Sequence, residues 1–287
     1  MYTASPRPTF NEPTAIPRQA ATRHLWGDTS SGEVEDWIYV SSDKIHQLLF
    51  GLPPGGWFRH SDSYRTVFAA DEVLYVLSGC MVVANPETGE VYRLPPGQAA
   101  FFRRDTWHHV YSYGSAALRV LELFAPPPSQ GTSGAYARKQ PFLSDIRYTQ
   151  DEIVGNWPMR RVESDAKRTI QVISEESYGW RLEGDADPIL VGLLVSTEHL
   201  TAGKLLLRPG QQSQVRSHDG DESLYVLEGV LNVRTHDGGP PNWFELHPGD
   251  GFYLPQGTPY QYYNMGSEMV GLLFGVAPSY KSGRTPG

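Results

Sequence analysis

DEVLYVLSGCMVV, from Asp71 to Val83, occurs a second time as DESLYVLEGVLNV, from Asp221 to Val233. Further along, LPPGQAAFFRRDTWHHVYSYGS (Leu94 to Ser115) returns at nearly the same spacing as LHPGDGFYLPQGTPYQYYNMGS (Leu246 to Ser267). Both copies consist of alternating apolar runs that are broken by Pro-Gly turns. A repeat of this length and pattern predicts two copies of one β-rich unit.

The amino-acid composition agrees with two β-rich units. With 287 residues, of which 39% are hydrophobic and 12% aromatic, the chain can bury one large core or two ordinary ones. The 29 glycines and 23 prolines indicate many turns, which suit short strands better than long helices. We therefore expect an all-β protein.

Charge and cysteine content narrow the classes of function. The formal net charge is −8 and no run is rich in lysine and arginine, so we expect no nucleic-acid partner. Cys80 is the only cysteine, which excludes an intramolecular disulfide. No segment has the pattern of a signal peptide or the run of about 18 apolar residues that spans a membrane. We expect a cytoplasmic protein without a membrane partner.

The composition along the chain predicts its domain organisation. Residues 1–25 are rich in Pro, Thr and Ala without periodicity and are expected to form an N-terminal arm. Strand-like runs indicate one closed antiparallel unit over 26–125 and a second over 169–278. Between them, 126–168 is expected to be a short helical and irregular connector, and 279–287 is a polar tail.

The second copy carries a recognisable series of residues: Gly210, Arg216, His218, Glu222, Gly229, Gly249, Pro255, Gly257, Tyr260 and Asn264. Their spacing resembles the two motifs of the cupin superfamily, Gly-x5-His-x-His-x3,4-Glu-x6-Gly and Gly-x5-Pro-x-Gly-x2-His-x3-Asn. Arg216 and Tyr260 stand where two of the motif histidines are expected. The resemblance implies a bicupin, with two tandem jelly-roll β-barrels.

The first copy resembles the same motifs more loosely. Glu72 and His108 stand at the positions of the motif glutamate and last histidine, whereas Arg103 and Asp105 replace the usual Pro and Gly. The loop before Glu72 is interpreted as about five residues longer than in the second copy, so His60 is the nearby histidine that remains for the ligand set. The resemblance thus implies a 2-His-1-carboxylate metal site of His60, Glu72 and His108.

A competing interpretation of these residues involves no metal. His60 would then cap the Arg59-to-Asp62 turn, His108 would pack beside Trp107, and Glu72 would need another partner because an unpaired buried carboxylate is costly. His46, in an earlier strand, is a candidate fourth ligand or hydrogen-bond donor, with either facing open. With metal, we expect one divalent cation per chain, iron being favoured and manganese, nickel or zinc being alternatives.

The second copy holds a candidate site of Arg216, His218, Glu222 and Tyr260. His218 and Glu222 keep two ligand types, but a fixed cation at Arg216 would repel a metal. Tyr260 is a ligand only as a phenolate, and a phenol ordinarily titrates near pH 10. A degenerate barrel is therefore favoured, in which Arg216 pairs with Glu222 or holds a substrate carboxylate.

The resemblance also supplies candidate reactions, because cupins include dioxygenases, polyketide cyclases, isomerases, decarboxylases, lyases and non-catalytic binding proteins. The open triad and the surrounding aromatic residues favour a metal-dependent dioxygenase that acts on a small oxygenated molecule, aromatic or polyketide-like molecules being candidates. The first alternative is a cyclase, isomerase or lyase that uses Lewis-acid catalysis, with His46, Tyr64 or Glu122 moving protons.

Arg59 and Trp107 are candidate substrate-binding residues. The second alternative is a bicupin that binds a small molecule without catalysis. A homodimer formed by strand exchange is also expected, with the N-terminal arm as the exchanged element.

Overall fold

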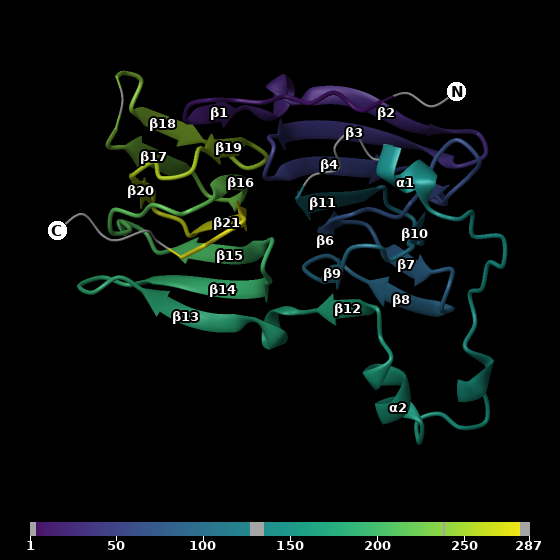
Figure 1. Cartoon of the computed structure of the whole chain (residues 1–287). Coiled ribbons are helices and arrows are strands. Elements are labelled where there is room, and N and C mark those ends of the chain that lie inside the picture. Colours follow the sequence, from purple (N-terminus) through teal and green to yellow (C-terminus); the bar gives the residue numbers. More distant parts are fainter. Residues whose placement is uncertain (1–3, 127–134, 238, 282–287) are drawn as a thin grey trace.

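The computed structural model describes residues 4–126, 135–237 and 239–281, which form two β units side by side (Figure 1). Each unit contains one seven-stranded sheet and one smaller antiparallel sheet. Helices are few and short. This architecture confirms the prediction of an all-β protein with two tandem jelly-roll barrels. Within the described residues, no helix is long and apolar enough to cross a membrane.

The first barrel is built on a sheet with the strand order β12-β9-β6-β11-β4-β3-β2. Its strands are β2 (Thr22–Asp28), β3 (Gly32–Ser41), β4 (His46–Leu52), β6 (Asp71–Ser78), β9 (Ala99–Phe102), β11 (Leu118–Ala125) and β12 (Ile170–Ile173). The smaller sheet has the order β5-β10-β7-β8. It contains β5 (Trp57–Phe58), β7 (Met81–Asn85), β8 (Glu90–Leu94) and β10 (His109–Ser112).

The second barrel repeats this plan with the strand order β1-β19-β16-β21-β15-β14-β13 and a smaller sheet β18-β17-β20. The large sheet contains β1 (Thr14–Ile16), β13 (Gly179–Glu183), β14 (Ile189–Ser196), β15 (Thr201–Leu207), β16 (Asp221–Glu228), β19 (Gly251–Leu254) and β21 (Val270–Ala277). The small one contains β17 (Leu231–Thr235), β18 (Trp243–Leu246) and β20 (Tyr260–Tyr263). β6 and β16 are the two copies of the repeat.

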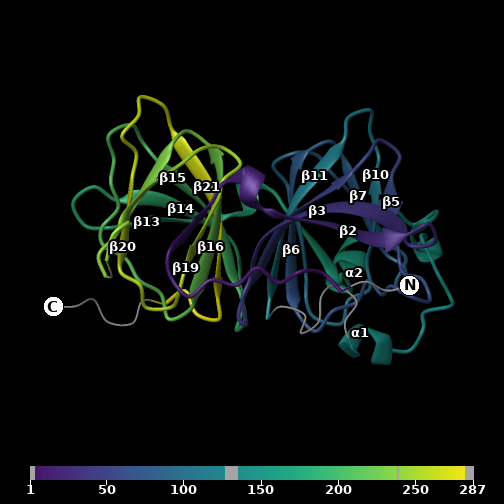
Figure 2. The same cartoon turned by 90° about the horizontal axis from the view of Figure 1, so that it is seen from above.

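The two barrels exchange edge strands within the chain, which corrects the predicted domain limits. β1, in the N-terminal arm, pairs with β19 of the second barrel, and β12 pairs with β9 of the first. Figure 2 shows the N-terminal segment running along the second barrel. Each exchange covers a sheet edge that would otherwise offer unpaired backbone groups. The arm is already paired inside its own chain, so it is not free to be exchanged with a second chain as the sequence suggested. A homodimer stays a prediction.

The connector is helical and irregular in its described part, as expected. It holds α1 (Ala135–Lys139), the 3₁₀ turn η2 (Asp151–Ile153) and α2 (Arg161–Ala166). Residues 127–134 of the predicted connector lie outside the described residues. Two further 3₁₀ turns, η1 (Arg18–Ala20) and η3 (Glu175–Ser177), lie elsewhere in the chain.

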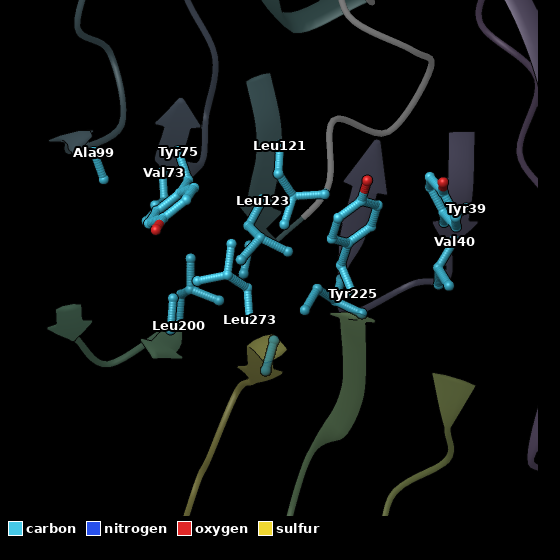
Figure 3. Packing of buried hydrophobic residues seen from close by; sticks show 14 of the residues in the cluster. Tyr39, Val40, Val73, Tyr75, Ala99, Leu121, Leu123, Leu200, Tyr225 and Leu273 are labelled. Carbon is cyan, nitrogen blue, oxygen red and sulfur yellow. The ribbon is translucent and has the colours of Figure 1, made fainter. Parts of the chain in front are cut away.

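Buried apolar residues form three clusters, because each large sheet is apolar on both faces. One cluster fills the first barrel, another fills the second, and the third lies between the two large sheets. Figure 3 shows Leu121 and Leu123 of the first barrel facing Leu200 and Leu273 of the second. An interface this apolar holds the two barrels in a fixed arrangement.

Two aspartates at equivalent repeat positions bridge the barrels. Asp71 of β6 accepts a hydrogen bond from the Thr197 hydroxyl at 2.6 Å, and Asp221 of β16 accepts one from the Ser42 hydroxyl at 3.0 Å. Each hydroxyl comes from a hairpin of the opposite barrel. Both carboxylates are buried, so each hydroxyl satisfies a charge that has little access to water.

Replacing Thr197 by valine is expected to lower the free energy of unfolding by about 1–3 kcal/mol, because the buried Asp71 carboxylate loses a charge-assisted hydrogen bond. Urea unfolding of wild type and variant measures the change. Ser42→Ala removes the equivalent bond to Asp221 and is expected to cost a similar amount. If neither variant differs measurably from wild type, the bridging bonds do not stabilise the fold.

Candidate functional site

Strand alternation brings three polar side chains into the interior of the first barrel. On β11, Glu122 and Phe124 lie on the same face, since they are two residues apart. Phe124 pairs with His46 of β4 on one side and with Glu72 of β6 on the other. Residues paired across antiparallel strands share a face of the sheet. His46, Glu72 and Glu122 therefore share the inner face.

Glu72 and His108 meet in this interior. The Nε2 atom of His108 lies 3.6 Å from the Oε1 atom of Glu72, and both side chains are only 1% exposed. Glu72 also forms a hydrogen bond with Glu122. Two carboxyl groups share a hydrogen bond only when one of them carries a proton. The pair therefore holds one proton between its two side chains.

Burial shifts the ionisation of every titratable group in this cluster. Burial raises the pKa of Glu122 to about 7, although its hydrogen bond with Glu72 acts to lower that pKa. Burial also raises the pKa of Glu72, and the charge of Glu122 adds to this increase. It raises the pKa of Asp36 on β3, and the charge of Glu122 adds to this. Burial lowers the pKa of His108 to about 4 and that of His46 to about 3. Burial thus shifts all five groups toward their neutral forms, while Glu122, with a pKa of about 7, is still partly ionised at neutral pH.

Several polar atoms of the barrel interior have no hydrogen-bond partner within the described chain. They are Asp36 Oδ2, His46 Nε2, Thr66 Oγ1 and Glu72 Oε1. Buried polar atoms in proteins are nearly always satisfied by protein, water or an ion. No lysine or arginine of the described ranges belongs to the buried residues, so the acidic side chains have no buried cationic partner.

A small cavity lies among these side chains. Its volume is about 30 Å³, enough for one or two water molecules or a similarly small group. Asp36, Thr66, His108 and Glu122 line it together with apolar residues, which are Trp26, Val34, Leu48, Phe50, Phe58 and Phe68. The aromatic and aliphatic wall excludes bulk water, and this strengthens electrostatic interactions inside the cavity.

Equivalent backbone hydrogen bonds align the two barrels residue by residue. Thr66 in the first barrel takes the place of Arg216 in the second, and Phe68 takes the place of His218. The bonds are His108 N to Thr66 O (3.1 Å), Tyr260 N to Arg216 O (2.8 Å), Asp105 N to Phe68 O (2.7 Å) and Gly257 N to His218 O (2.9 Å). The interpretation of a longer loop before Glu72 is therefore wrong. Thr66 and Phe68 occupy the two motif histidine positions, and neither is a usual metal ligand.

His60 is not part of the cluster, which corrects the predicted triad. Its Nδ1 atom lies 2.8 Å from His109 Nε2, and its Nε2 atom lies 2.8 Å from the carbonyl oxygen of Leu143 in the connector. Both ring nitrogens are thus engaged away from Glu72 and His108. Across the described residues, no three His, Cys, Asp or Glu side chains are grouped closely enough to hold a metal ion.

The remaining predicted residues divide between the cavity and other places. Glu122 lines the cavity, whereas Arg59 is exposed and stacks over Trp57, with 4.4 Å from its guanidinium carbon to the ring centre. Trp107 packs against the His60 ring at 4.8 Å, and Tyr64 lies in the apolar core of the first barrel. The structure therefore gives Arg59, Trp107 and Tyr64 no place in the cavity wall.

Asp36 and Thr66 were missed by the sequence analysis. Asp36 begins the otherwise strand-like segment DWIYVSS, and its alternation with the buried Ile38 was the available signal. Thr66 carried no signal, because threonine is common in strands.

The second barrel contains a buried network that satisfies itself. Glu222 accepts hydrogen bonds from the hydroxyl groups of Tyr260 and Tyr262, the latter at 2.8 Å, and its Oε2 atom lies 3.3 Å from His218 Nε2. Burial alone would raise the pKa of Glu222, but contacts with His218, Arg216 and Tyr260 outweigh it and lower the pKa. Burial and the charge of Glu222 raise the pKa of Tyr260, so Tyr260 stays a phenol.

Arg216 pairs with Glu183 rather than with Glu222, which corrects one predicted alternative. Its Nη2 atom lies 3.2 Å from Glu183 Oε2 and donates to the Tyr280 hydroxyl at 2.7 Å. The second barrel thus places an arginine and a histidine among two glutamates. The fixed charge of Arg216 thus offsets part of the negative charge of the two glutamates, whereas no buried arginine or lysine of the described residues does so in the first barrel.

Comparisons with known proteins agree with this architecture. The family described as "Cupin domain" matches residues 49–124 and 203–275, which together are more than half of the chain. No curated protein matches the chain by sequence.

Solved structures of two-barrel proteins superpose over most of the chain. Lactobacillus farciminis oxalate decarboxylase in a formate complex is 12% identical with a TM-score of 0.61, covering 96% of this chain and 88% of its own. Bacillus subtilis oxalate decarboxylase, a protein with Mn(II) centres, is 13% identical with a TM-score of 0.60, covering 94% and 78%. AerE from Microcystis aeruginosa is 10% identical with a TM-score of 0.58, covering 90% and 97%. At these identities the likeness shows the fold alone.

Proposed function

Because the chain belongs to the cupin family and carries its domain twice, we propose that it is a metal-dependent enzyme whose active site is the first barrel. Its substrate is a small, compact, oxygenated molecule. The second barrel has a structural role in this proposal.

The contrast between the two barrel interiors supports the proposal. In the first, Asp36, Glu72 and Glu122 are buried together without a cationic side chain, and two of them keep an unpartnered oxygen. In the second, Glu222 is fully engaged by tyrosine and histidine. An uncompensated group of buried carboxylates is costly unless protons or a cation neutralise it. A divalent cation would do this in the first barrel.

Two donor atoms of the first barrel are available to such a cation. Glu72 Oε1 has no hydrogen-bond partner and lies 3.6 Å from His108 Nε2, so one carboxylate and one imidazole are available side by side. No third His, Cys, Asp or Glu side chain of the described residues is grouped with these two, so water or substrate oxygens would complete the coordination. A carboxylate and an imidazole together suit manganese or iron(II). When bound, the cation would supply Lewis-acid stabilisation of negative charge on substrate oxygens.

The chain's own residues supply the proton chemistry. Glu122 lines the cavity wall, and burial raises its pKa to about 7, so it can give a proton to a bound molecule or take one. Phe50, Phe58 and Phe68 exclude water from the reacting atoms. These features favour a reaction by proton transfer, as in an isomerase, a lyase or a decarboxylase.

A dioxygenase is less favoured on this geometry, because the preference for it rested on the triad with His60, which is not assembled. The size of the cavity also restricts the substrate. A volume of about 30 Å³ has to widen for any substrate, so a compact molecule of a few heavy atoms, which needs less widening than an aromatic or polyketide-like one, is proposed instead.

Elemental analysis of protein purified without chelator tests the metal site. About one equivalent of manganese or iron is expected in wild type and in His218→Ala, the matched control in the second barrel, and a loss of it in His108→Ala. Loss only in His218→Ala would move the site to the second barrel. No metal in any sample would overturn a metal-dependent enzyme.

Screening small hydroxy, keto and dicarboxylic acids with and without oxygen tests the reaction class. Turnover that persists without oxygen is expected for proton-transfer chemistry. A strict requirement for oxygen would contradict it and favour the dioxygenase.

A further inference from the structure

We infer that the mouth of the second barrel is a recognition site for phenols and that the chain's own Tyr280 fills it. Tyr280 lies just beyond β21, the last strand, and close to the end of the described residues. Its side chain reaches back into the barrel mouth, where it makes more specific contacts than a surface residue needs.

The ring of Tyr280 lies between two other rings. It packs against His218 at a tilt of 31°, with centroids 4.5 Å apart, and it stacks on Phe274 at 5.5 Å and 28°. Offset stacking of this kind adds to the stabilisation from apolar burial. His218 and Phe274 belong to the barrel itself, so the walls of this slot do not depend on Tyr280.

Two guanidinium groups lie near the same ring. The guanidinium carbon of Arg181, on β13, is 4.8 Å from the ring centre, and that of Arg216 is 5.8 Å from it. Cations near an aromatic ring are attracted by the electron density of its face. The slot is therefore selective for an electron-rich ring, as a phenol ring is.

The hydroxyl of Tyr280 is bound both as a hydrogen-bond acceptor and as a hydrogen-bond donor. It accepts a hydrogen bond from Arg216 Nη2 at 2.7 Å and donates one to Glu183 Oε1 at 2.8 Å. Burial is the main reason that the pKa of Tyr280 rises, to about 12, so the hydroxyl keeps the proton that it donates. One donor and one acceptor placed for a single hydroxyl distinguish a phenol from a plain apolar ring.

Two hydrogen bonds hold the backbone around Tyr280 in place. His218 Nδ1 lies 2.7 Å from the Tyr280 carbonyl oxygen, and the Asp219 N–H donates to the Lys281 carbonyl at 3.2 Å. The contacts of the ring and the hydroxyl are all made by atoms that a free 4-alkylphenol also has. A small phenol can therefore replace the side chain once the side chain is absent, and it competes with Tyr280 when the side chain is present.

Titration of Tyr280→Ala with 4-methylphenol, followed by calorimetry and thermal unfolding, tests the inference. We expect binding of one molecule per chain and a higher melting temperature. Toluene, which has the ring without the hydroxyl, is expected to bind at least tenfold more weakly. Wild type is expected to bind 4-methylphenol about tenfold more weakly than the variant, because the attached tyrosine has an effective concentration in the millimolar range.

Tyr280→Phe provides a second variant if Tyr280→Ala does not fold. It keeps the ring and loses both hydroxyl bonds, so its slot is more easily opened and 4-methylphenol should bind it more tightly than wild type. Adding Glu183→Gln to Tyr280→Ala should weaken binding. The inference is overturned if folded Tyr280→Ala does not bind 4-methylphenol or binds toluene equally well.

Discussion

Glu222→Gln is expected to lower the free energy of unfolding by about 3–5 kcal/mol, the usual cost of removing one partner from a buried charged group. Glu222 accepts from Tyr260 and Tyr262 and faces His218, and its side chain is only 2% exposed. A neutral amide offers one oxygen instead of two and brings its own N–H donors against those hydroxyl groups. Arg216, which pairs with Glu183, also loses a second negative charge nearby.

Urea unfolding monitored by fluorescence measures this change. Glu228→Gln is a matched control, since Glu228 lies on the same strand, β16, but is exposed, and its substitution should change stability by less than about 0.5 kcal/mol. A cost below about 1 kcal/mol for Glu222→Gln would show that the network of the second barrel is not a stabilising unit.

Glu72→Gln, at the equivalent position of the first barrel, is expected to have the opposite effect and to stabilise the metal-free protein. Glu72 faces another buried carboxyl, Glu122, and no buried arginine or lysine of the described residues balances them. An uncharged amide of the same shape removes this unfavourable pairing, so the free energy of unfolding should rise by about 1–3 kcal/mol. Urea unfolding in the presence of a chelator measures it.

Manganese should make wild type more stable than Glu72→Gln, which reverses the order expected without metal. Added Mn²⁺ is expected to stabilise wild type by about 2.7 kcal/mol at a hundredfold excess over its dissociation constant, and to leave Glu72→Gln nearly unchanged. If Glu72→Gln is less stable than wild type in chelator, the carboxyl pair is satisfied in a way that the charge argument does not describe.

The fold was predictable from the sequence because the repeat carries its own strand pattern. β6 and β16 are each followed directly by a glycine, Gly79 and Gly229, with positive φ values of 79° and 73°. A Cβ at Gly229 would lie 2.3 Å from the carbonyl oxygen of Met269, so no other residue fits this turn without a shift. Such local constraints can be recognised in one sequence.

The candidate site was predictable only in part. Glu72 and His108 keep motif positions, and the structure does bring them together. His60 was assigned because it is the nearest histidine in the chain, but its position depends on Leu143, in the connector far along the sequence. Thr66 and Phe68, which hold the histidine positions, lie between β5 and β6 outside any strand, and their residue types gave no sign of the alignment.

The exchanged strands were also invisible to pattern analysis, because the pairing of β1 with β19 and of β12 with β9 joins segments that are distant in the chain. This arrangement has a consequence for how the protein can be divided. A fragment cut in the connector would take β12 away from the first barrel or β1 away from the second, leaving β9 or β19 as a bare sheet edge. Such edges are where β proteins associate wrongly with one another. Although the repeat suggests two separable domains, each barrel completes its large sheet with a strand from the other side of the connector, so the two halves depend on each other to fold.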